Sequence, residues 1–163
     1  MSDFKITMNE ALQLKETVQR KLLQNQFVFR NENSIPSDAK RSYNLKKLAK
    51  EDEDLRQKMV TLKLLIQEAN LRIPEGETNV VSYYIFLLSE RKRQIDNIRA
   101  MPTDEGSRIL SDNNTIKYNC TFNNADKNDW LNKLNKEYRE ISNKLTKINS
   151  ELIVSLPFNP SKI

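Results

Sequence analysis

The chain has 163 residues, of which 27 are lysine or arginine and 22 are aspartate or glutamate, so its formal net charge is +5. It contains no histidine, one cysteine and only two glycines. These counts exclude Ser-His triads, His-ligated metal sites, an intramolecular disulfide and a Gly-rich phosphate loop, and they argue against a β-sandwich or barrel.

A first helix is predicted to begin at Thr7, because Thr7 and Glu10 have the spacing of a capping box. The helix should end near Phe29 or Arg30, and residues 31–43 are predicted to form a polar connector. Its buried face is expected to use Met8, Ala11, Val18, Leu22 and Phe29, with Lys15 and Asn25 as more polar positions.

A second helix is predicted over about 44–71 and a third over about 78–100, separated by the turn at residues 74–76. Because a short turn joins antiparallel helices, these two are expected to be direct neighbours. A fourth helix is predicted from residue 124 or 126 to about residue 154.

Between the third and fourth helices, residues 107–122 carry β-branched and aromatic side chains on both sides of a polar turn, which predicts a β-hairpin insertion. Residues 155–163 contain Pro157 and Pro160 and are predicted to form a flexible tail. The sequence therefore predicts a mainly α fold with a single domain over residues 1–163. Its expected architecture is an antiparallel four-helix bundle with a small β-hairpin between helices three and four.

Apolar residues recur at steps of three and four in the last three predicted helices, which places them on one buried face of each helix. The charged residues Asp52 and Arg91 interrupt two of these ladders. Either each reaches solvent at the flank of its ladder, or it belongs to an internal polar layer that fixes register or binds an anion. The rise of about 1.5 Å per residue separates their levels by roughly 10 Å, so they are not expected to form one ion pair. The ladders are Leu45, Leu48, Asp52, Leu55, Met59, Leu62, Ile66 and Ala69; Val81, Tyr84, Leu88, Arg91, Ile95 and Ile98; and Leu131, Leu134, Tyr138, Ile141, Leu145, Ile148 and Leu152.

Arg91 is the stronger candidate for an anion site, because Lys92, Arg93 and Arg99 are close to it in sequence and a guanidinium binds phosphate or carboxylate in bidentate fashion. Asn70, near the end of the second helix, is expected to cap that helix, to hydrogen-bond between helices or to contact a ligand. The candidate ligand-binding residues are therefore Arg91, Arg93, Arg99 and Asn70. No catalytic residue, metal site or cofactor is predicted.

The longest apolar run, residues 80–88, contains Tyr83 and Tyr84, which are expected to pack with their hydroxyls at the rim. Ser82 interrupts this run, which is too short to cross a membrane. Because the N-terminus also lacks the apolar segment of a signal peptide, the protein is expected to be cytoplasmic. Its modest, unclustered charge does not predict a nucleic-acid surface.

Four segments carry a family resemblance: Glu10-Ala11-Leu12 with Gln19, Arg20 and Leu22; Ile66-Gln67-Glu68-Ala69-Asn70; Leu88-Ser89-Glu90-Arg91; and Arg139-Glu140-Ile141 through Ile148-Asn149. Their order over roughly residues 8–152 resembles a bacterial family named after septicolysin. The chain departs from the family pattern at Gln67, where the family favours asparagine, and at Asn149-Ser150, where it usually has Asn-Trp. The resemblance implies an all-helical core, a small β element and self-association.

These observations lead to a hypothesis of a non-enzymatic, self-associating helical protein that acts by binding a partner. The expected assembly is a homo-oligomer, because the helices carry long apolar faces and the hairpin has a free edge. An alternative is the sequestration of a small anionic ligand, such as a nucleotide signal, at a subunit interface, as a phage or mobile element would need. A second alternative, suggested by the family name, is a cytolysin-like toxin.

Overall fold

The computed structural model describes residues 3–37, 39–104, 106–109 and 115–163. Within these residues the chain is mainly helical, as predicted, with four α-helices. The chain divides into two compact units, of which unit 1 comprises Met1–Val81 and Lys147–Ile163 and unit 2 comprises Ser82–Thr146. The arrangement of all four helices in one bundle stays a prediction.

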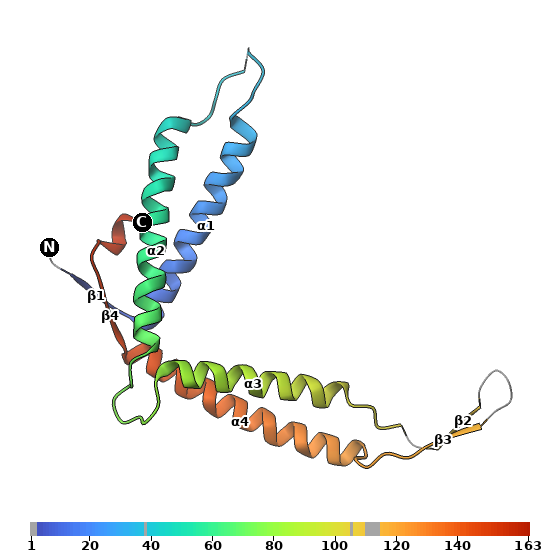
Figure 1. The fold of residues 1–163 in the computed structure, drawn as a ribbon. Coiled ribbons are helices and arrows are strands. Elements are labelled where there is room, and N and C mark those ends of the chain that lie inside the picture. Colours follow the sequence, from blue (N-terminus) through green and yellow to red (C-terminus); the bar gives the residue numbers. More distant parts are fainter. Residues whose placement is uncertain (1–2, 38, 105, 110–114) are drawn as a thin grey trace. The chain divides into compact units, whose positions relative to one another are not determined.

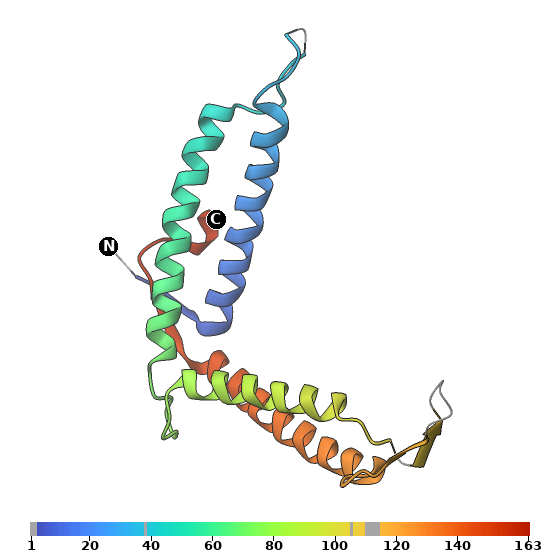
Figure 2. The ribbon, with the colours of Figure 1, turned by 45° about the vertical axis from the view of Figure 1, so that its right-hand side comes forward.

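Unit 1 is built on two long helices, α1 (Met8–Glu32) and α2 (Leu45–Asn70), which lie side by side (Figures 1 and 2). Both helices begin where a side chain caps them. The Thr7 hydroxyl accepts a hydrogen bond from the Glu10 N–H at 3.2 Å, and the Asn44 side chain accepts one from the Lys47 N–H at 3.1 Å. The Thr7 N–H donates to the Glu10 carboxylate at 2.6 Å, and this bond, followed by one from the Thr7 hydroxyl, lowers the pKa of Glu10. The predicted capping box is therefore confirmed.

The core of unit 1 contains the ladder of α2 from Leu55 to Ala69 together with one face of α1, whereas the first rungs, Leu45 and Leu48, are only partly buried. The side chains of Ala11 and Leu62 are fully buried. Two strands, β1 (Phe4–Thr7) and β4 (Ile153–Leu156), form an antiparallel pair in which Phe4 lies opposite Leu156. The buried core residues are Met8, Ala11, Val18, Leu55, Met59, Leu62, Ile66, Ala69, Val154 and Leu156.

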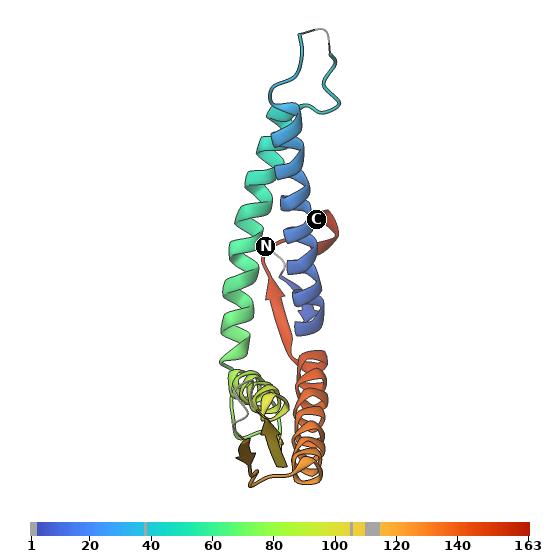
Figure 3. The same ribbon diagram turned by 90° about the vertical axis from the view of Figure 1, so that its right-hand side faces the viewer.

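The C-terminal segment corrects one prediction. Residues 155–163 were expected to be a flexible tail, but the structure gives them the end of strand β4 and the 3-10 helix η1 (Pro160–Lys162). Strand β4 lies against α1 and α2 (Figure 3), and because strand side chains alternate between two faces, Val154 and Leu156 both enter the core. This apolar burial is what fixes the segment in place.

Unit 2 contains helix α3 (Val81–Ala100) from its second residue onward, strands β2 (Gly106–Ile109) and β3 (Thr115–Tyr118), and helix α4 (Asn124–Glu151) as far as Thr146. Strands β2 and β3 pair antiparallel, with Gly106 opposite Tyr118. Helices α3 and α4 pack through buried ladder positions, and partly buried aromatic and aliphatic side chains surround them. The buried residues are Ile95, Ile98 and Leu134, and the surrounding ones are Trp130, Leu131 and Tyr138.

Candidate functional site

Asp52, the first charged interruption of a ladder, is buried within unit 1, with 7% of its surface exposed. One carboxylate oxygen accepts a hydrogen bond from the Asn25 side chain on α1 at 3.2 Å, and the other pairs with Arg56 Nε at 2.7 Å. Asn25 is one of the two polar positions, with Lys15, that were expected on the buried face of the first helix. Asp52 and Asn25 therefore meet across the α1–α2 contact and form a polar layer, which satisfies the buried carboxylate.

Replacing Asp52 by alanine should lower the free energy of unfolding by about 1–3 kcal/mol, because the half-buried Asn25 amide loses its acceptor. Asp54→Ala is the matched control, since the Asp54 side chain is 63% exposed on the same helix and its loss should cost less than about 0.5 kcal/mol. Replacing both Asn25 and Asp52 by leucine should restore most of the loss, because an apolar pair can substitute for a satisfied polar one. Urea titration of the variants measures these differences, and equal values for Asp52→Ala and Asp54→Ala would contradict the polar layer.

Arg91, the second interruption, is paired within unit 2. Its Nε lies 3.1 Å from a carboxylate oxygen of Glu137 on α4, without the alignment of a hydrogen bond, and its Nη1 donates to the Gln94 side chain at 2.8 Å. About a third of each ion-pair side chain is exposed, 35% for Arg91 and 33% for Glu137. An anion binding at Arg91 would have to compete with this carboxylate, so the surroundings of Arg91 favour a packing role between α3 and α4.

The other predicted site residues do not converge on Arg91. Arg93 pairs with Glu90 at 3.5 Å and Arg99 pairs with Asp96 at 3.6 Å, both as exposed pairs along α3. Successive residues turn by about 100° around a helix, so Arg93 points to the side of α3 opposite Arg91. Asn70 belongs to unit 1 whereas the three arginines belong to unit 2, so a site built from all four residues stays a prediction.

Helix α3 exposes aromatic side chains on the face opposite its ladder. Phe86 is 68% exposed and Tyr83 is 45% exposed, and the exposed residues Glu90 and Arg93 continue the same face at helical spacing. We call these four residues the outer face of α3. The Tyr83 ring meets the buried Tyr84 ring edge-to-face, with centroids 5.4 Å apart and an interplanar angle of 83°, a contact that favours this orientation of Tyr83.

The sequence contains a pattern that indicates this exposed face. The interpretation of both Tyr83 and Tyr84 as packing residues missed it. The first turns of α3 are apolar on every side, whereas a surface helix normally has an apolar stripe on one side only. Tyr84 is buried as expected, but Tyr83 and Phe86 lie on the solvent side. Exposed aromatic residues on a helix are typical of a surface that binds another protein.

The comparisons with known proteins show the fold alone. No family model matches the chain, and no curated protein matches it. A solved structure of a functionally unknown conserved protein from Corynebacterium diphtheriae is similar, with a TM-score of 0.72 and 15% identity, over 93% of this chain and 99% of that chain. The resemblance to the septicolysin family stays a prediction.

Two further searches bear on the kinds of site that the chain contains. Among residues 3–37, 39–104, 106–109 and 115–163, none of the helices is both long enough and apolar enough to span a bilayer. Within the same ranges, no group of three or more cysteine, aspartate or glutamate side chains is placed to hold a metal ion.

Proposed function

We propose that this protein is a non-enzymatic binding protein that self-associates through the outer face of α3. The observation that carries the proposal is the exposure of Phe86, at 68%, beside the oriented ring of Tyr83. Aromatic anchors that are held in place before binding dominate the energetics of protein interfaces, because they bury a large area at a small entropic cost. A second copy of the chain would cover these rings.

The order of residues along the outer face supports a symmetric pairing. Tyr83 and Arg93 lie at equal sequence distances on either side of residue 88. A twofold axis at that level would pair two antiparallel α3 helices, so that Arg93 of each copy meets Tyr83 of the other. A guanidinium over an aromatic face is a favourable cation–π contact, and the same arrangement would place Phe86 against the aliphatic stem of Glu90.

Phe86→Lys should weaken self-association by about 30-fold to 1,000-fold in Kd, the loss expected for a central aromatic anchor. Phe27→Lys on α1 is the matched control, because Phe27 is also 68% exposed but does not belong to this face. Sedimentation velocity over a concentration series would measure both variants. We expect the wild type and Phe27→Lys to associate alike and Phe86→Lys to remain at the chain mass of 19.1 kDa. A wild type that stays at 19.1 kDa at every concentration, or equal effects of the two variants, would refute the proposal.

A further inference from the structure

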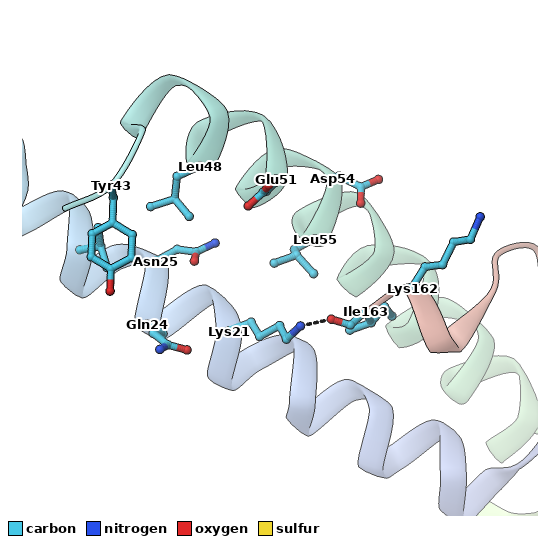
Figure 4. A pocket seen from close by; sticks show the side chains of 11 residues that line it. Lys21, Gln24, Asn25, Tyr43, Leu48, Glu51, Asp54, Leu55, Lys162 and Ile163 are labelled. Carbon is cyan, nitrogen blue, oxygen red and sulfur yellow. Dashed lines mark hydrogen bonds between the residues drawn. The ribbon is translucent and has the colours of Figure 1, made fainter. Parts of the chain in front are cut away.

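A cleft in unit 1 is lined by side chains of α1, of α2 and of the C-terminal segment (Figure 4), and it borders the apolar core at Leu55. Its volume is about 490 Å³, which is within the range of small-molecule sites. The cleft is independent of the outer face of α3. Its lining combines one aromatic, several aliphatic and several polar side chains: Lys21, Gln24, Asn25, Val28, Tyr43, Leu48, Glu51, Asp54, Leu55, Lys162 and Ile163.

The apolar part of the lining suits a flat ligand. Val28 and Leu55 are buried side chains of α1 and α2, while Tyr43 is half exposed at 50%. The residues on either side of Tyr43 are fixed in place. Arg41 donates to two carbonyl oxygens at the end of α1, each at 3.1 Å, and Asn44 caps α2. These contacts fix the backbone on both sides of Tyr43, and an exposed aromatic ring at this position can stack on a planar ligand.

Two amide side chains of α1 supply unused hydrogen-bonding groups. The Asn25 Nδ2 donates to Asp52 at 3.2 Å, which fixes the orientation of the amide and leaves its carbonyl oxygen as an acceptor. Within the part of the chain that the structure describes, the Gln24 side chain has no hydrogen-bond partner, so it offers both a donor and an acceptor. Such amides pair with the edges of nucleobases, which carry donors and acceptors side by side.

The acidic side chains around the cleft are paired with lysines, whereas one of its basic side chains is not paired within the described part of the chain. Glu51 and Asp54 already pair with lysines of their own helix, Lys47 at 3.8 Å and Lys58 at 2.7 Å. At the other end, Lys21 donates to the Ile163 carbonyl oxygen, whereas the Lys162 ammonium has no ion-pair partner among the described residues. The exposed Lys162 side chain extends away from the other labelled side chains in Figure 4, and its flexible stem would let the ammonium turn back to meet an anionic group at this end. The paired carboxylates remain able to accept hydrogen bonds from hydroxyl groups.

We propose that the cleft between α1 and α2 binds a nucleotide. The base stacks on Tyr43 over the aliphatic wall, and its edge pairs with Gln24 and Asn25. The ribose hydroxyls donate to Glu51, and the phosphate lies toward Lys162. The three arginines of α3 are each already paired with a carboxylate: Arg91, Arg93 and Arg99. The cleft is therefore better suited to a nucleotide than these arginines are.

Thermal unfolding of the full chain with AMP, adenosine and inorganic phosphate tests the ligand class. At ten times its Kd, AMP should raise the Tm by about 3 °C or more, and adenosine should act more weakly because it lacks the phosphate. Phosphate alone should have little effect. A shift below about 1 °C with millimolar AMP, or an equal shift with phosphate alone, would overturn the proposal.

Variants locate the site. Tyr43→Ala should raise the Kd for AMP by about fivefold to a hundredfold through the loss of stacking, with Tyr118→Ala as the control. Lys162→Gln should weaken AMP by up to about fivefold and leave adenosine unchanged, with Lys63→Gln as the control. NMR should show the side-chain amide signals of Gln24 and Asn25 shifting as AMP is added. Binding that survives Tyr43→Ala but is lost in Arg91→Gln would overturn the cleft as the site.

Discussion

Leu62→Ala should lower the free energy of unfolding by about 2–5 kcal/mol, one of the two largest effects expected for a single substitution in this chain. Leu62 is 0% exposed at the centre of the α1–α2 contact, so truncation removes apolar contacts and leaves a cavity that the neighbouring side chains fill only in part. The loss is a large fraction of the total stability of a typical domain. Denaturant titration followed by circular dichroism measures it.

Leu64→Ala is the matched control for this prediction. Leu64 lies two residues further along α2 and is 62% exposed, so the same truncation should change the free energy of unfolding by less than about 0.5 kcal/mol. If the two variants lose similar stability, the face of α2 that packs against α1 has been assigned wrongly. A loss in Leu62→Ala without a change in the denaturant slope would show that only stability has changed.

Leu156→Ala should also cost about 2–5 kcal/mol, although it lies in a segment that the sequence suggested was a flexible tail. Leu156 is 0% exposed in the core of unit 1, and strand β4 holds it there through its pairing with β1. A residue in a flexible tail would give no measurable loss, so this substitution discriminates between the two descriptions.

Ile153→Ala, on the same strand, is the control for the second prediction. Ile153 is 44% exposed and points to the other face of β4, so its truncation should cost less than about 1 kcal/mol. Chemical denaturation of both variants at one pH gives the comparison. Equal, small losses would mean that the strand does not dock on the core in solution.

The helices of this chain could be predicted from the sequence because their signals are local. The Thr7 cap and the ladder of α2 involve residues within a few turns of one another; the cap is confirmed, and so is the ladder from Asp52 to Ala69. The pairing of β1 with β4 could not be predicted in this way. Each strand has only four residues, and so short a strand is stabilised only by pairing with a partner that is distant in sequence.

The predicted site illustrates a different limit. Arg91, Arg93 and Arg99 are close in sequence, but their positions around α3 send them to different sides, and each meets its own carboxylate. Asp52 was recognised as needing a partner, whereas the identity of that partner, Asn25, depended on which helices are neighbours. Sequence patterns thus identified residues that required explanation, and the tertiary arrangement decided what each of them does.

The discontinuous composition of unit 1 has a consequence for the order of events during synthesis. Residues 82–146 form unit 2 as one continuous segment, whereas β1 must wait for residues 153–156 before it can pair. At ribosomal rates of about 5–20 residues per second, this delay is on the order of 10 s. Helices α1 and α2 are made long before β4, whereas the end of unit 2 precedes β4 by only a few residues, so we expect α1 and α2 to pair first, while β1 is still unpaired. The final step in unit 1 would then be the docking of β4, which pairs with β1 and adds Val154 and Leu156 to the core.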